Sequence, residues 1–133
     1  SGVMSDAANI KQQRGTALVV RAQDRQRALD AALAIAARAG RHVVCEPHEL
    51  LEDDFGLAEL LHCAPETIVV EGFPTRPRAL RRLKHLVTSD KVEVHRKGLW
   101  PTVERMPNII LATGSADCLR IDEQSRRFIV VEA

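Results

Sequence analysis

The fold of this chain is decided by residues 16–45, which read TALVVRAQDRQRALDAALAIAARAGRHVVC. Residues 16–20 and 42–45 are short β-branched runs, which are typical of buried strands. Between them, small apolar side chains recur on one face of a helix expected over about 24–39, with Asp24 as its N-cap. Strand, helix and strand within about 30 residues predict a βαβ unit with parallel strands.

The same alternation of strands and helices continues along the chain. Further short apolar runs, typical of buried strands, occur at residues 67–70, 108–113, 118–121 and 128–131. One helix is expected over about 47–63, broken near Gly56, and another is expected to follow Thr75 as its cap with Pro77 in its first turn. Residues 91–95 alternate with period two, as in a strand with one wet face. The pattern predicts an α/β three-layer sandwich with a mainly parallel sheet and a C-terminal β-hairpin.

Length and composition exclude several classes of protein. The chain has 133 residues, of which 45% are hydrophobic and 28% are charged, and this suits one globular domain. We expect residues 1–14 to form a flexible leader and residues 15–133 to form the domain. No run approaches the roughly 18 apolar residues of a membrane span, and the spacing of the three cysteines suits neither a disulfide framework nor a metal site. These features favour a cytoplasmic protein without a metal, cofactor or membrane partner.

Charge is strongly segregated along the chain, although the net charge is only +1. Residues 46–59 contain six acids and no Lys or Arg, whereas residues 76–97 contain eight Lys and Arg against two acids. A basic segment of this size can neutralise several phosphates, which predicts nucleic-acid binding. Two other interpretations stay open. The segments are either two solvated faces without a partner, or they form a head-to-tail contact between copies of the chain.

Four motifs follow one another in the second half of the chain. They are ETIVVEGF (66–73), LKHLVTSDKVEVHRKG (83–98), NIILATGS (108–115) and DEQSRRFIVVE (122–132). Their order resembles the helicase domain of phage and plasmid primase-helicases, in the superfamily 3 group of ring-forming P-loop ATPases. In that family a strand ends in the Walker B acids, a helix and a basic hairpin follow, a strand then ends in a polar sensor, and a double Arg precedes the last strand. The resemblance implies a P-loop-NTPase-like fold and a role in replication.

The parts of that family that grip a nucleotide are missing or altered in this chain. A phosphate loop belongs just after the first strand, where residues 21–27 read RAQDRQR and contain no Gly, Lys, Ser or Thr. Glu71 stands alone at the Walker B position, and Gly114-Ser115 replace the sensor Asn. We therefore expect a degenerate domain that does not hydrolyse nucleotides. Its vestigial nucleotide site would comprise Arg21, Arg25, Arg27, Glu71, Ser115, Arg126 and Arg127.

The resemblance also implies a DNA contact. In the family, the hairpin between Walker B and the sensor touches DNA through cationic residues at its tip, which match His95, Arg96 and Lys97 here. Together with the basic helix, the expected DNA-binding residues are Arg78, Arg81, Arg82, Lys84, His95, Arg96 and Lys97. Trp100 has two interpretations, since an indole can stack on a base or anchor the hairpin by packing.

These inferences predict a non-catalytic P-loop-like module of a phage or mobile-element replication system. It would bind DNA, or a replication protein on DNA, through the basic helix and the hairpin. One alternative is an ATPase with an atypical phosphate site built on residues 21–27 and Glu71, and another is an adaptor or self-assembly module. The backbone path at residues 21–27 discriminates between them, because a helix that starts directly from the strand leaves no loop to wrap a phosphate.

Overall fold

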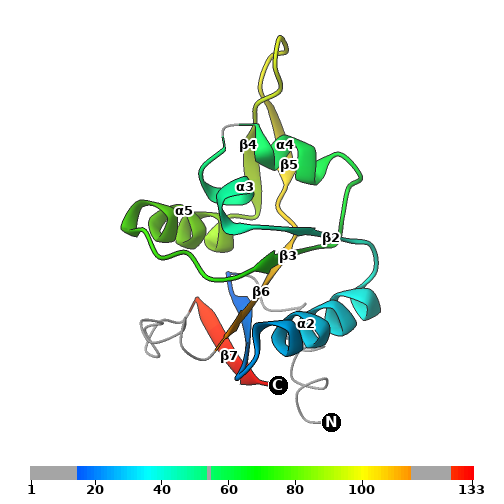
Figure 1. Cartoon of the computed structure of the whole chain (residues 1–133). Helices are drawn as coiled ribbons and strands as arrows, with labels where there is room; N and C mark the ends of the chain where they lie inside the picture. Colours follow the sequence, from blue (N-terminus) through cyan, green and yellow to red (C-terminus); the bar gives the residue numbers. More distant parts are fainter. Residues whose placement is uncertain (1–14, 54, 115–126) are drawn as a thin grey trace.

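The computed structural model describes residues 15–53, 55–114 and 127–133, and it forms three layers (Figure 1). The middle layer is a five-stranded parallel sheet with the strand order β2-β3-β6-β1-β7. Its strands are β1 (Ala17–Ala22), β2 (His42–Cys45), β3 (Thr67–Glu71), β6 (Asn108–Gly114) and β7 (Phe128–Glu132). The helices are α2 (Arg25–Ala39) on one face, and α3 (Pro47–Leu51), α4 (Gly56–Leu61) and α5 (Pro77–Thr88) on the other.

The central strands are buried on both faces, which is why they appear in the sequence as uninterrupted apolar runs. In β1, Ala17 and Val19 pack into the core beneath α3, α4 and α5, whereas Leu18 and Val20 pack against α2. The sheet therefore separates two apolar cores. The predicted three-layer α/β sandwich with a mainly parallel sheet is confirmed, and its architecture is consistent with the P-loop-NTPase-like fold.

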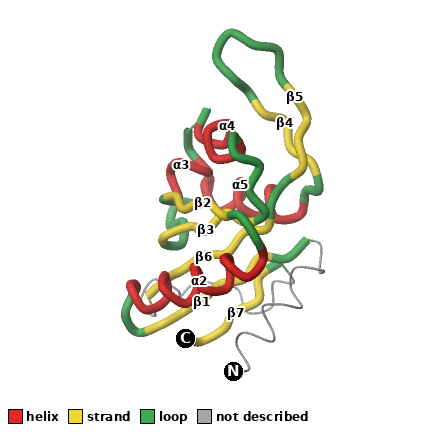
Figure 2. Tube along the Cα trace, turned by 90° about the vertical axis from the view of Figure 1, so that its right-hand side faces the viewer, coloured by secondary structure: helices red, strands yellow, loops and turns green. Residues whose placement is uncertain are grey.

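An antiparallel hairpin leaves the body of the domain between α5 and β6 (Figures 1 and 2). It consists of β4 (Lys91–Val94) and β5 (Thr102–Arg105). Val92 and Val94 are buried while Lys91 and Glu93 are exposed, as the period-two pattern predicts. The residue pattern did not predict strand β5, because the sequence TVER has only one apolar residue, whereas the family resemblance implied a hairpin at this place.

Local chemistry sets the starts of the two long helices. The Asp24 carboxylate accepts a hydrogen bond from the Gln26 backbone N–H at 3.1 Å, which confirms the predicted N-cap of α2. The expected cap at Thr75 is wrong. Arg76 is the N-cap residue of α5 and makes no capping bond through its side chain, so Pro77 with its preset backbone angle begins the helix.

The C-terminal strand closes one edge of the sheet. The strand expected at 128–131 is β7, which pairs in parallel with β1. Its expected hairpin partner at 118–121 lies outside the described residues, as does the leader expected at 1–14. No helix in the described part of the chain combines the length and apolarity that a membrane span requires.

Candidate nucleic-acid interface

The connection between β1 and α2, where a phosphate loop would lie, consists of only two residues, Gln23 and Asp24. The helix therefore starts almost directly from the strand. The Asp24 carboxylate occupies the helix N-terminus, which is the place where backbone N–H groups and the helix dipole would favour a phosphate. A negative side chain at that position repels a phosphate, so this connection is unsuited to the grip of a P-loop.

The vestigial nucleotide site is largely dispersed. Arg21 forms an ion pair with Glu132 on the neighbouring strand β7, donating from Nε at 2.6 Å. Arg27 is exposed on α2, and Arg127 is exposed just before β7. Two further members lie outside the described residues, namely Ser115 and Arg126. The Arg21 guanidinium is therefore already paired with a carboxylate of the protein.

Two described members of the vestigial site share a cavity. Arg25 and Glu71 line a pocket of about 300 Å³ at the carboxyl edge of the sheet, together with Gly72, which has a φ of 124°. Glu46 just before α3 and Glu52 just after it also line this pocket. Its three acids outnumber the two arginines, Arg25 and Arg76, so the pocket lacks the net positive charge that a triphosphate requires.

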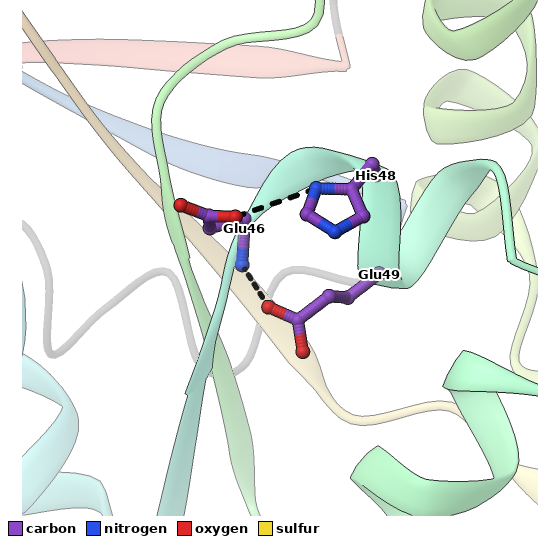
Figure 3. A group of neighbouring side chains, drawn as sticks. All are labelled: Glu46, His48 and Glu49. Carbon is purple, nitrogen blue, oxygen red and sulfur yellow. Dashed lines mark hydrogen bonds and ion pairs between the residues drawn. The ribbon is translucent and has the colours of Figure 1, made fainter.

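A group of metal-ligand residue types lies beside this pocket, at the start of α3 (Figure 3). The ligand atoms of Glu46, His48 and Glu49 lie within 4.8 Å of one another. His48 Nδ1 is 3.4 Å from Glu46 Oε2, and the Glu46 backbone N–H donates to Glu49 Oε1 at 3.0 Å. The second contact is one half of a capping box, so the capping of α3 accounts for the position of Glu49.

Cys45 ends β2 next to this group and is buried. Burial, followed by the carboxylates of Glu49, Glu71 and Glu46, raises the pKa of the Cys45 thiol from 9.0 to about 12. A thiol that stays protonated is neither a nucleophile nor a metal ligand. Cys45 therefore belongs to the apolar core, and Cys63, which is exposed, is the accessible thiol of the two.

We expect Cys45 to resist thiol reagents in the folded protein. In a chain with Cys63→Ser and Cys118→Ser, its thiolate fraction near pH 8 should fall about a thousandfold relative to the unfolded chain, as the raised pKa requires. Because the unfolded thiol loses its proton first, the free energy of unfolding should fall as pH rises from about 9 towards 12. Labelling kinetics and urea titrations measure both effects. Native labelling as fast as that of Cys63 in a chain with Cys45→Ser and Cys118→Ser would contradict this assignment.

Helix α5 presents a cationic stripe to solvent. Arg78, Arg81 and Arg82 are exposed at positions i, i+3 and i+4, on the side away from buried Leu83. Lys84 is half-buried at the margin of the stripe. In the described part of the chain, no acid lies within ion-pair distance of these four cations. The sequence predicted a basic helix here, and the structure places its three arginines on the surface.

A groove joins part of this stripe to the hairpin. Arg78 and Arg82 line a cavity of about 960 Å³ together with His95, so three of the residues predicted to bind DNA lie around one groove. Glu52 and Asp53 line the same groove. The acidic and basic segments of the sequence are therefore neighbours within one molecule, and their charges partly compensate each other there.

The cations at the hairpin tip differ in their surroundings. The Arg96 guanidinium donates to Glu104 Oε2 at 2.6 Å and to Thr102 Oγ1 at 3.1 Å. The hydrogen bond from Arg96 lowers the pKa of Glu104, and the same bond raises the pKa of Arg96. Arg96 is therefore held within the hairpin, whereas Lys97 is exposed and, in the described ranges, has no acid within ion-pair distance.

Two features of the hairpin are decided by the structure alone. Trp100 is 91% exposed, so the interpretation of this indole as a packing anchor is wrong. Arg105 lies directly opposite Lys91 in the ladder, and both side chains are exposed. Neither feature has a signal in the local sequence, because each depends on how β4 and β5 pair.

The parallel sheet and its crossover helices define a three-layer α/β domain whose architecture is consistent with a P-loop-like fold, and only two residues connect β1 to α2. Among solved structures, the chain is similar to the C-terminal region of NrS-1 in its A-form apo state. One such structure has a TM-score of 0.64 and 17% sequence identity, and covers 89% of this chain and 29% of that chain. A second has a TM-score of 0.62 and 17% identity, and covers 98% of this chain and 32% of that chain.

These likenesses show a shared fold, and this chain spans about a third of the length of those structures. No protein-family model matches the sequence, and no curated protein matches it either.

Proposed function

We propose that this chain is a non-catalytic P-loop-like module of a phage or mobile-element replication system. It binds DNA, or a replication protein on DNA, through α5 and the β4–β5 hairpin. The resemblance of residues 66–132 to primase-helicases supports the replication role, and the fold shared with the NrS-1 C-terminal region agrees with it.

The observation that carries this proposal is a contrast between two surfaces. The cations Arg78, Arg81 and Arg82 are exposed without acidic partners in the described residues, whereas the position of the phosphate loop holds the helix cap Asp24. Planar guanidinium groups bind phosphate through paired hydrogen bonds, so a row of them suits a polyanion. A nucleotide would have to displace a carboxylate from the N-terminus of α2.

Charge reversal on α5 tests the proposal. Arg81→Glu combined with Arg82→Glu should weaken binding of a labelled single-stranded oligonucleotide of about 20 nucleotides by roughly tenfold or more, because phosphate contacts are replaced by repulsion. Fluorescence anisotropy measures the affinity.

The matched control places the same change of charge on the other face of the sheet. Arg27→Glu combined with Arg38→Glu alters two exposed arginines of α2 and should leave the affinity within about twofold, since both lie outside the expected contact area. Equal losses of affinity in the two double variants would contradict the assignment of the DNA contact to α5. Phosphate release from ATP that disappears in Glu71→Gln would contradict the non-catalytic role.

A further inference from the structure

The hairpin exposes two large apolar side chains at its tip, Leu99 and Trp100, and a third on its stem, Val103. Leu99, Trp100 and Val103 account for three of the five large hydrophobic side chains that are exposed in the described residues, and Trp100 is the only Trp of the chain. The indole contributes nothing to either core. A large aromatic side chain presented to water in this way marks a contact site.

The hairpin is braced so that it presents this tip beyond the body of the domain, at the end remote from β7 (Figure 2). Glu104 accepts hydrogen bonds from Arg96 at 2.6 Å and from Thr102 Oγ1 at 2.8 Å, just where the ladder ends. Beyond that point the Leu99 backbone N–H donates to the Arg96 carbonyl at 3.1 Å, and Gly98 has a φ of 76°. The tip is therefore a hydrogen-bonded turn, and hydrogen bonds to Glu104 join the two sides of the stem below it.

The exposed face of the stem carries like charges side by side. Lys91 and Arg105 are directly opposite in the ladder, and within the described ranges no acid lies at ion-pair distance from either. Like charges in opposed positions destabilise a strand pair. The next pair on this face is Glu93 with Val103, and Glu93 Oε1 lies 3.2 Å from His95 Nε2. An anionic partner would relieve the repulsion between Lys91 and Arg105.

From these features we infer that the hairpin recognises an unpaired nucleobase by stacking it on Trp100, while Lys91 and Arg105 contact the phosphates of the same strand. The inference rests on the proposed function and specifies its substrate class as single-stranded nucleic acid. Five residues of extended chain separate Arg105 from Trp100, roughly 16 Å, so one strand can reach both. A duplex hides the faces of its bases in the stack, whereas an unpaired base offers its face to an indole.

The charges of the chain favour a single strand over two other partners for the apolar tip, namely a second copy of the chain and a membrane surface. The groove on a second copy of the chain is lined by Glu52, Asp53 and Glu93 as well as by Arg76, Arg78 and Arg82, so it offers no net negative charge to Lys97 at the tip. A membrane surface would bring Glu93 and Glu104 of the stem towards the headgroups, along with only three exposed apolar side chains. A single strand uses both the indole and the cations.

The single Trp provides the test. Titration with an oligo(dT) of about 12 nucleotides should quench Trp100 fluorescence in a saturable manner, whereas a duplex of the same length should bind without quenching. Trp100→Ala should lower the affinity for oligo(dT) about tenfold, and Trp100→Phe should restore most of it, since stacking of one base needs only an aromatic face. The matched control is Val44→Ala, which shortens an exposed apolar side chain of β2, outside the hairpin, and should leave the affinity unchanged.

Arg105→Gln provides a second readout. It should weaken oligo(dT) binding and raise the melting temperature slightly, because it removes a phosphate contact and the repulsion with Lys91 together. Equal quenching by duplex, or no loss of affinity in Trp100→Ala, would overturn the inference while leaving the proposed function standing. No binding of either oligonucleotide would refute this inference together with the direct DNA binding of the proposed function. A change in Trp100 fluorescence on raising the protein concentration alone would assign the tip to contact with a second copy. A change on adding anionic phosphatidylserine vesicles alone would assign it to a membrane surface.

Discussion

Raising the salt concentration from about 50 to about 200 mM should weaken binding of this chain to single-stranded DNA by about 50-fold. Each phosphate neutralised by a side-chain cation releases bound counterions, so affinity falls as a power of salt concentration. About four contacts to a single strand give a log–log slope near −2.8, and a fourfold increase in salt then produces this loss. Arg81, Arg82, Lys97 and Arg105 are exposed cations that can supply such contacts.

The measurement is an anisotropy titration at several salt concentrations, repeated with Arg81→Gln and with Arg38→Gln. Loss of one contact should reduce the slope by about 0.7 in Arg81→Gln and leave it unchanged in Arg38→Gln, which lies on the opposite layer. A slope near zero would show that binding is not electrostatic and would remove the basis of the proposed interface. A slope reduced equally in the two variants would place the contact elsewhere.

Gly56→Ala should destabilise the protein by roughly 3 kcal/mol or more, although the same change in an ordinary helix stabilises by about 1 kcal/mol. Gly56 is the first residue of α4 and is buried against α3. A Cβ atom there would lie 1.9 Å from the carbonyl oxygen of Glu49 and 3.0 Å from its carbonyl carbon. Those atoms belong to the backbone of α3, so the two helices would have to separate.

Thermal and urea unfolding measure this effect, and a loss of about 3 kcal/mol corresponds to a fall of roughly 10 °C in melting temperature for a chain of this size. Gly98→Ala is the matched control. It also introduces a methyl group, but no atom lies within 4 Å of the new Cβ, and only the φ of 76° opposes it. Its cost should be on the order of 1 kcal/mol. An equal or smaller effect at Gly56 would show that α3 and α4 are not in backbone contact.

The sequence predicted the break in the helix near Gly56, but the helix propensity of glycine is only part of the reason for it. The poor helix propensity of glycine indicated an interruption, and α3 and α4 are indeed separate helices. The close approach to Glu49 explains why glycine is required at that position. Residues 49 and 56 are near in sequence, but their backbones meet only because both helices pack on the same face of the sheet.

The sequence by itself determined the class of fold. Strands buried on both faces and helices buried on one face have different periodicities, and both are local properties of the chain. Residues 16–45 therefore predicted the parallel βαβ unit, and the missing glycines at 21–27 already indicated that a phosphate loop was absent.

Only the tertiary structure decided which cations and apolar groups are available to a partner. Arg96 and Lys97 are adjacent in sequence, yet one is held by Glu104 and the other is exposed. Trp100 is exposed because the turn carries it past the end of the ladder, and Lys91 meets Arg105 because of the register between β4 and β5. Register depends on contacts between residues far apart along the chain, so local periodicity can predict burial along a strand but cannot identify the residue that lies opposite.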